Sequence, residues 1–313
     1  MAGAPRYDSE HMLNRRAFSR DLAGAALGAA TVAGASAAED NPAIAPFKIS
    51  VMLWTVFRDL PFEQRLEKVV EAGYTNVELV GEYKKWSDSE FTRYNARRKQ
   101  LGINFDTTAG LRHAIGNPAD RDAMLADVRN ELPIMEKLDC PACIVMSGNV
   151  VPGMPRETQH ESCIEGLKRA ASIIEGKQIN GQPVRLLLEN IDPEENPKYY
   201  LTSVAEGFEI IRAVNHPQVQ FLDDFFHEQI AEGNLIEKLE KNIQYTGLVH
   251  IADVPGRHEP GTGEINYGNI YKKLAELKYD RMVAMEFLPT SDPVAKLRKA
   301  REDALRLTAA TSA

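Results

Sequence analysis

Four apolar runs decide the fold of this chain: RLLLEN (residues 185–190), VQFLDD (219–224), GLVHIAD (247–253) and MVAMEF (282–287). Each run is short and rich in residues that favour strands, and each carries an acid or a histidine at or near its end. These polar residues are Glu189, Asp224, His250 and Glu286, which lie 26 to 36 positions apart. In a barrel of parallel strands all carboxyl ends open onto one face, so the four side chains are expected to converge there.

Strand-like runs alternate with longer amphipathic stretches along the rest of the chain. Strands are expected at residues 49–53, 76–79, 103–107, 143–146, 185–190, 220–223, 248–251 and 283–287. Helices are expected at residues 61–72, 89–101, 118–138, 157–175, 203–214, 234–241, 267–277 and 291–307. The alternation indicates parallel strands, and eight units predict an α/β fold closed into a single-domain (β/α)8 or TIM barrel.

The first 37 residues have the features of an export signal. Arg15 and Arg16 precede an Ala/Gly-rich apolar stretch (22–34), which ends in the small-residue sequence ASA (35–37). This order predicts a twin-arginine signal peptide, with a disordered tail as the alternative. The stretch is too short for a transmembrane helix, which needs about 20 apolar residues. We therefore expect export to the periplasm, with a signal peptide (1–37), a linker (38–46) and the barrel (47–313).

The charge of the chain narrows the range of partners. Its formal net charge is -8 at pH 7, whereas a nucleic-acid groove needs clustered Lys and Arg to neutralise phosphates. Binding to an anionic membrane is disfavoured for the same reason. We therefore expect no nucleic-acid partner and no stable membrane association.

The cysteines give little guidance. Cys140 and Cys143 have the C-x-x-C spacing of redox sites, but they lead into an expected strand instead of starting a helix, where the dipole would lower a thiol pKa. We expect Cys143 to be a small core residue and Cys163 to lie in a helix. A disulfide between any two of the three cysteines is an alternative, because an oxidising compartment would permit it.

Three carboxylates and one imidazole at the strand ends form a ligand set for one divalent cation. Asp223 is the rival of Asp224, since strand alternation sends the two side chains to opposite faces. The three-residue spacing to His227 favours Asp224. We expect His227 to face an oxygen of a bound substrate, with a packed loop histidine as the alternative.

The run HIADVPGRHEPGTGEINY (250–267) is dense in polar and turn residues. Its Pro and Gly residues predict a rigid loop, from which Arg257 can form a forked contact with a carboxylate or hydroxyl pair of a small ligand. His258 and Glu259 would close over that ligand or form a solvated loop salt bridge.

This loop closely resembles the corresponding loop of hydroxypyruvate isomerases, within the xylose isomerase-like superfamily of sugar isomerases and epimerases. The resemblance continues through PFEQRLEKVVEAGYTNVELV (61–80), LLLENID (186–192), DDFFH (223–227) and AMEFLP (284–289). It implies that Glu189, Asp224, His250 and Glu286 hold a metal and that both glutamates act as acid/base groups. His227 and Arg257 are then substrate contacts, and Glu195, His258 and Trp54 complete the expected substrate-binding set.

Two positions depart from the hydroxypyruvate isomerase pattern. Leu288 stands where those enzymes typically carry a basic residue. His250 stands where they often have Gln and where ketose epimerases have His.

Carboxylate-rich ligation with one imidazole favours Mn²⁺ or Mg²⁺, with Co²⁺ or Zn²⁺ as alternatives. The aromatic residues Trp54, Phe57 and Trp86 are expected either to pack against the face of a bound sugar or to pack in the core.

The predicted function is divalent-metal-dependent isomerisation of hydroxypyruvate or a related small α-hydroxy-carbonyl compound. Such a reaction removes a proton from carbon and passes through an enediolate, which a divalent cation stabilises as a Lewis acid. An exported ketose or keto-sugar epimerase or lyase would use the same groups, and a noncatalytic periplasmic sugar-binding protein would keep only the pocket. A metal-dependent endonuclease is disfavoured by the negative charge and by the presence of only seven histidines. The expected partner is a small keto acid or sugar, and a homo-oligomer is compatible with the sequence.

Overall fold

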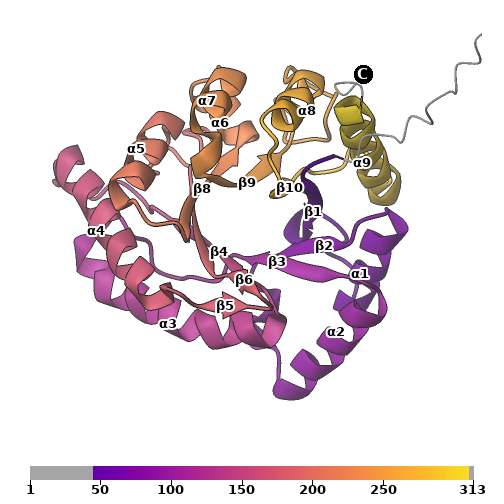
Figure 1. Cartoon of the computed structure of the whole chain (residues 1–313), viewed down its shortest axis with the longest axis horizontal. Coiled ribbons are helices and arrows are strands. Elements are labelled where there is room, and N and C mark those ends of the chain that lie inside the picture. The colour runs from indigo at the N-terminus through magenta and orange to yellow at the C-terminus, as the bar shows by residue number, and fades with distance from the viewer. Residues whose placement is uncertain (1–44, 310–313) are drawn as a thin grey trace, which may run out of the picture. The chain divides into compact units, whose positions relative to one another are not determined.

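The computed structural model describes residues 45–309, which form a closed barrel of eight parallel strands with helices around it (Figure 1). Around the barrel the strands are β1 (Lys48–Met52), β2 (Asn76–Leu79), β3 (Asn104–Thr108), β4 (Ala142–Met146), β7 (Arg185–Glu189), β8 (Val219–Asp224), β9 (Thr246–Ile251) and β10 (Met282–Met285). The predicted TIM barrel is confirmed. The predicted signal peptide lies outside the described residues.

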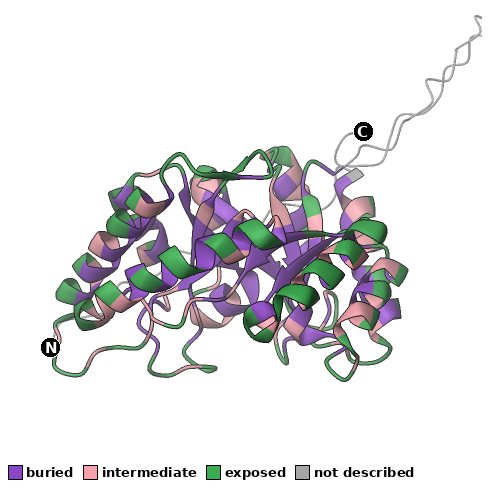
Figure 2. Ribbon diagram, turned by 90° about the horizontal axis from the view of Figure 1, so that it is seen from below, coloured by how far each residue is buried: buried purple, intermediate pink, exposed green. Residues whose placement is uncertain are grey.

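Helices connect successive strands and cover the outer face of the barrel (Figures 1 and 2). They are α1 (Phe62–Glu71), α2 (Asp88–Gln100), α3 (Arg121–Leu138), α4 (Arg156–Ile174), α5 (Val204–Val214), α6 (Phe225–Ala231), α7 (Leu235–Asn242), α8 (Tyr267–Glu276) and α9 (Pro293–Ala309). Short 3-10 turns are η1 (Leu53–Thr55), η2 (Glu82–Lys85), η3 (Pro118–Asp120) and η4 (Ile243–Tyr245). Within residues 45–309 no helix combines the length and the apolar character needed to cross a membrane.

Local sequence explains where these helices begin and which face they bury. Ser87 starts α2 with a capping box, in which its side chain accepts from the Glu90 backbone while the Glu90 side chain accepts from the Ser87 backbone. In α1, Leu66 and Val69 are fully buried while Glu63 is half-exposed, as the helical period of an amphipathic segment requires. Tertiary packing of such faces supplies most of the stability of a surface helix.

The two-residue period of the strands decides what faces the barrel interior. Leu187, Leu222, Leu248 and Ala284 belong to a small inner core, whereas Leu188, Phe221, Val249 and Val283 pack in the larger cores beneath the helices. Two residues further along the inner-facing series come Glu189, Asp224, His250 and Glu286. The alternation that fills the barrel therefore also brings these four side chains to its carboxyl-terminal mouth.

Three features differ from the expected elements. A short helix, α6, starts directly after β8, so His227 is helical and does not lie in a loop. A two-stranded hairpin, β5 (Gln178–Ile179) with β6 (Gln182–Pro183), precedes β7 and was not predicted. The expected helix at 118–138 is the turn η3 followed by α3. Strand and helix ends otherwise lie within about two residues of the predicted ones.

Some aromatic and sulfur side chains have structural roles. Trp86 packs against Phe62, Tyr94 and Phe91, with ring centroids 4.6, 4.6 and 5.3 Å away, so core packing describes it better than the wall of a sugar site. Cys140, Cys143 and Cys163 are buried free thiols. Burial raises the pKa of Cys143 and that of Cys163 to about 12, which disfavours the reactive thiolate.

Candidate metal centre and substrate pocket

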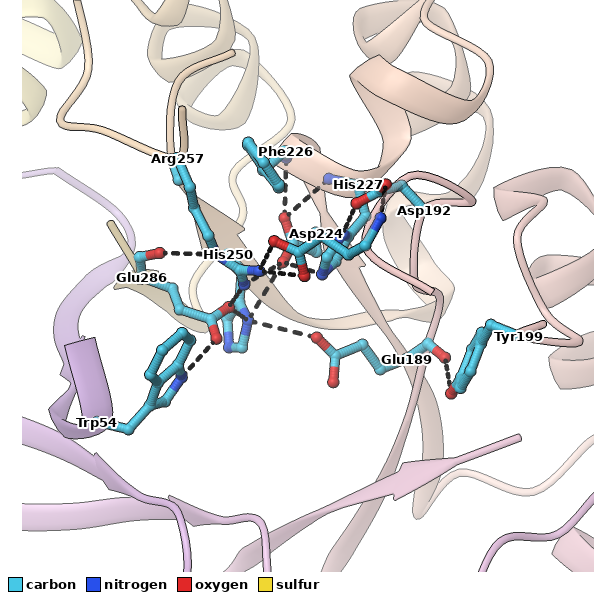
Figure 3. Close-up of polar contacts among 12 residues, drawn as sticks. Trp54, Glu189, Asp192, Tyr199, Asp224, Phe226, His227, His250, Arg257 and Glu286 are labelled. Carbon is cyan, nitrogen blue, oxygen red and sulfur yellow. Dashed lines mark hydrogen bonds and ion pairs between the residues drawn. The ribbon is translucent and has the colours of Figure 1, made fainter. Parts of the chain in front are cut away.

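Four buried side chains meet at the mouth of the barrel (Figure 3). One ligand atom from each of Glu189, Asp224, His250 and Glu286 lies within 4.8 Å of the other three. His250 Nδ1 is the central atom of the set, 2.6 Å from Glu286 Oε2 and 3.8 Å from both Glu189 Oε1 and Asp224 Oδ2. The sequence grouped these residues, and the fold brings them together.

His250 is oriented by Glu78, a fully buried acid on β2. Its Nε2 lies 3.0 Å from Glu78 Oε2, so the proton of the neutral imidazole belongs on that nitrogen and the Nδ1 lone pair faces the other three residues. Neither His250 Nδ1 nor Glu286 Oε2 has a partner in hydrogen-bond geometry, although the two atoms are close. Two buried lone-pair atoms without a hydrogen-bond partner are suited to bind a divalent cation together.

Asp224 is held by the first turn of α6. Its Oδ1 accepts from the backbone of Phe226 at 2.8 Å and of His227 at 3.3 Å, so this carboxylate is the N-cap of the helix. Its Oδ2 is left to face the centre. Asp223 lies on the opposite face, where it interacts with Glu228, and this agrees with the choice of Asp224 over its rival.

The two glutamates have opposite acidities. Burial raises the pKa of Glu189 to about 8, and the nearby carboxylates of Glu286 and Asp224 add to that rise. Burial acts in the same sense on Glu286, but without a metal the charges of Arg257 and of a protonated His250 outweigh it and hold the pKa of Glu286 well below its usual range. One carboxyl group is thus suited to carry a proton at neutral pH and the other to stay ionised.

His227 is positioned by a residue that the sequence did not single out. Its Nδ1 lies 2.5 Å from Oδ2 of Asp192, whose Oδ1 accepts from the backbone of Glu194 and Glu195. Burial opposes protonation, but Asp224 and Asp192 together raise the pKa of His227 to about 9. Its Nε2 has no hydrogen-bond partner and lies 3.4 Å from Asp224 Oδ2, so it is available to an oxygen of a bound molecule.

Arg257 spans the mouth of the barrel from the loop after β9. Its Nη2 lies 2.9 Å from Glu286 Oε2 and 3.5 Å from Asp224 Oδ2, while its Nη1 donates to both oxygens of Glu195 at 2.9 Å. The guanidinium stacks between Trp54 and Phe226, 5.5 and 5.0 Å from the ring centroids. Its backbone has φ of 56°, a conformation that costs energy in a non-glycine residue and often marks functional loops.

The remaining predicted residues divide into two groups. Trp54 lies in the site, since its Nε1 donates to Glu286 Oε1 at 2.8 Å. Glu195 also lies at the site through Arg257. His258 is turned to the loop, where Nδ1 contacts the Leu288 carbonyl at 2.8 Å. Glu259 forms an ion pair with Lys296, whose Nζ lies 2.6 Å away, and accepts hydrogen bonds from Thr290, so its role is to hold the loop.

Two residues of the site were missed by sequence reasoning. Glu78 was an acid inside the apolar strand run NVELV, and Asp192 stood in the run LLLENID. A charged residue inside or just after an apolar strand run signals a specific partner, because burying an unpaired charge costs free energy. Each turns out to contact a histidine of the site.

Comparison with known proteins gives consistent matches. The family model "Xylose isomerase-like TIM barrel" matches residues 66–309. The 2-oxo-tetronate isomerase of Pectobacterium atrosepticum is 30% identical, over 77% of this chain and 92% of its own. The hydroxypyruvate isomerase of Escherichia coli is 28% identical, over 80% and 97%. The crystal structure of an AP endonuclease, family 2, from Brucella melitensis superposes with a TM-score of 0.71 at 25% identity, over 80% and 96%.

Proposed function

Because the chain belongs to the xylose isomerase-like TIM barrel family, we propose that it is a divalent-metal-dependent isomerase of a short α-hydroxy-carbonyl acid. The relatives named for hydroxypyruvate and for 2-oxo-tetronate support acids of three or four carbons as the substrate class. One observation carries the proposal. Two buried glutamates from different parts of the barrel, Glu189 and Glu286, converge on the same imidazole nitrogen, 3.8 and 2.6 Å from His250 Nδ1.

Glu189, Asp224, His250 and Glu286 would hold the cation through three carboxylates and Nδ1 of the imidazole. Carboxylate-rich ligation with one imidazole favours Mn²⁺ or Mg²⁺ over softer ions. When bound, the ion supplies Lewis-acid stabilisation of the oxygens that become negative as the enediolate forms.

Proton transfer then falls to the two glutamates. Glu286 stays ionised and is fixed by Trp54 and Arg257, so it is the candidate to remove a proton from the hydroxyl-bearing carbon. The Glu189 carboxylate makes no hydrogen bond to any described residue, so it is free to exchange a proton with a bound substrate. It is the candidate to deliver a proton to the neighbouring carbon, while the hydroxyl proton passes from one oxygen of the enediol to the other to complete the isomerisation.

Two cationic side chains would hold the substrate. Arg257 presents a fork suited to a carboxylate, and an incoming carboxylate would replace Glu195 or Glu286 as its partner. His227, with its second nitrogen bound by Asp192, can donate from Nε2 to the carbonyl oxygen. These contacts would hold the reacting carbons between the two glutamates.

The test is solvent isotope incorporation. The protein is incubated in D₂O with Mn²⁺ or Mg²⁺ and with hydroxypyruvate, 2-oxo-tetronate or a panel of ketoses, and products are followed by proton NMR. We expect deuterium on the carbon next to the carbonyl, because the proton that Glu189 delivers comes from solvent and is not the one that Glu286 removes. Isomerised product without deuterium would contradict delivery of the proton by a second glutamate. A lack of turnover on every compound would favour the noncatalytic sugar-binding protein.

A second candidate, epimerisation of a keto-sugar, has one specific observation in its favour. Leu288, which follows Glu286 by two residues, is an exposed leucine where hydroxypyruvate isomerases typically carry a basic residue. A missing cation weakens recognition of a carboxylate. Inverted configuration next to the carbonyl of a ketose, with no activity on keto acids, would select epimerisation over isomerisation.

A further inference from the structure

A cavity of about 570 Å³ lies at the end of the barrel opposite the candidate metal centre. Its lining includes the first residues of several strands, among them Lys48 of β1 and Arg185 of β7, and the hairpin β5–β6 forms one side of it. Residues of the hairpin line the cavity together with Phe105 and Asp106 of β3. Small-molecule sites typically have about 300 to 1,000 Å³, so the cavity is large enough for a small metabolite.

Arg185 is a half-buried cation without a counter-ion on the wall of this cavity. Among residues 45–309 no carboxylate oxygen lies within 4 Å of its guanidinium, and its one hydrogen bond is a long contact of 3.5 Å to the Gly247 carbonyl. Burial lowers the pKa of Arg185, and the nearby Arg281 contributes to that lowering. A half-buried guanidinium next to a second cation is a site where an anion would be stabilised.

Arg281 supplies the second guanidinium. It donates to the Thr246 carbonyl and, with the Gln220 amide oriented so that its oxygen faces the guanidinium, to Gln220 at 2.7 and 3.0 Å. These partners are neutral, so they fix its position without cancelling its charge. In the described part of the chain Arg281, like Arg185, has no carboxylate within 4 Å. Lys48 adds a third, exposed cation to the lining.

Asp106 contributes a different kind of group to the inner wall. It is the extra residue of a bulge in β3, since Val77 pairs with Phe105 and Glu78 with Thr107. It is 4% exposed, and neither carboxyl oxygen has a hydrogen-bond partner. Burial, together with the nearby Glu78, raises the pKa of Asp106 well above its usual range, which favours the protonated carboxyl, the form that can donate a hydrogen bond.

We propose that this cavity is a second binding site, which takes a small hydroxy- or keto-carboxylate through the paired guanidiniums of Arg185 and Arg281. The carboxylate of the ligand lies between the two arginines and its hydroxyl or carbonyl oxygen faces Asp106. A monoanion suits the site better than a dianion, because the lining also holds Asp139 and Asp280. The site shares no residue with the metal centre, so it is independent of the proposed function.

Isothermal titration of the full-length protein with glycerate, a small hydroxy-carboxylate, tests the proposal. We expect saturable binding, with Kd at or below the millimolar range, that Arg185→Gln and Arg281→Gln each weaken at least about 10-fold. Asp106→Asn keeps a neutral donor and should bind nearly as well as the wild type. The matched control is Arg169→Gln, which removes an exposed arginine of α4 outside both sites and should leave this binding event unchanged.

Three results would overturn the assignment. Binding that Arg257→Ala abolishes and Arg185→Gln does not would place glycerate at the metal centre instead. Arg185-dependent binding of inorganic phosphate without binding of glycerate would rule out a carboxylate site. Should Arg185→Gln fail to fold, Gln182→Trp on the exposed hairpin narrows the cavity without touching the barrel. Unchanged glycerate affinity in that variant would also refute the proposal.

Discussion

At the residue scale, the site is decided by which charges each carboxylate meets. Glu189 and Glu286 are both buried inner-facing residues at strand ends, yet only Glu286 touches a guanidinium and a tryptophan N–H. Two chemically identical side chains therefore titrate in different ranges. Differences of this kind are how one site provides both an acid and a base at the same pH.

Glu286→Gln preserves the shape of the side chain but removes the proposed base. We expect kcat to fall by about 10² to 10⁴-fold with folding retained, because a positioned acid/base group contributes about that much. Arg257→Ala should raise KM, because the fork for the substrate carboxylate is lost, and should also lower kcat, because Arg257 helps to keep Glu286 ionised. Steady-state kinetics on the best substrate separates the two effects. Turnover by Glu286→Gln at the wild-type rate would exclude the proposed proton transfer.

The four proposed ligands can be tested against a neighbouring residue. Glu189→Ala and Asp224→Ala should each lower the divalent metal content of the purified protein, because a mononuclear site depends on all of its donors. Asp223→Asn is the matched control, since Asp223 is next in sequence but faces the helices. Metal analysis by mass spectrometry measures this. Full metal occupancy in both alanine variants would refute the ligand assignment.

At the element scale, the junction of β8 and α6 buries two acids on its outer side. Glu228 is fully buried, its carboxyl oxygens have no hydrogen-bond partner, and its nearest cation is Lys238 Nζ at 3.4 Å. Burial raises the pKa of Glu228 to about 10, and that of Asp223 to about 7. Because the folded-state pKa of Glu228 is raised, its contribution to stability is full below pH 4.5 and is lost as pH rises toward 10.

Glu228→Gln mimics the protonated acid at every pH. We expect it to raise the free energy of unfolding at pH 8 by about 1–3 kcal/mol and to change it little at pH 4.5. Urea denaturation at both pH values measures the difference. The control is Glu232→Gln, which removes the other, more exposed partner of Lys238 and should change stability by at most about 1 kcal/mol. Equal destabilisation by Glu228→Gln at both pH values would contradict this account.

The same junction shows what periodicity in the sequence does and does not predict. The run VQFLDDFFH continues its apolar character from β8 into α6, so the start of the helix is hidden, although Asp224 before Phe225 is an N-cap signal. The hairpin β5–β6 has an Asn180-Gly181 turn, the strongest short hairpin signal, but polar flanks of two residues gave no strand pattern. The eight barrel strands had strand-like runs of four to six residues between helical segments and were found.

The residues of the candidate site also divide into those that the sequence predicts and those that it does not. Glu189, Asp224, His250 and Glu286 could be grouped from the sequence because each follows an apolar strand run, and the barrel predicts where such ends meet. Glu78 and Asp192 could not, since their roles depend on contacts 172 and 35 residues away that only the folded chain makes. The hydrogen bond of Trp54 to Glu286, across 232 residues, likewise requires the closed barrel.

At the scale of the whole molecule, the proposed metal ligands come from four strands, β7 to β10, that close the barrel only after most of the chain has been synthesised. A cation bound there would hold these strands together and would require a folded barrel to bind. A twin-arginine signal suits such a protein, because that route carries proteins already folded. The metal could then be loaded before the protein leaves the cytoplasm.

We therefore propose that residues 1–37 are a twin-arginine signal peptide and that the barrel works in the periplasm. The double variant Arg15→Lys with Arg16→Lys should accumulate in the cytoplasm, because the arginine pair is the address that the export machinery reads. Fractionation followed by immunoblotting measures this, and mass spectrometry of the exported protein should place the new N-terminus after Ala37. The matched control is Arg20→Lys, which changes a nearby arginine outside the pair and should leave export intact. Undiminished export of the double variant would show that the arginine pair is not the signal. An exported protein that still begins at Met1 would remove the basis for the proposed cleavage.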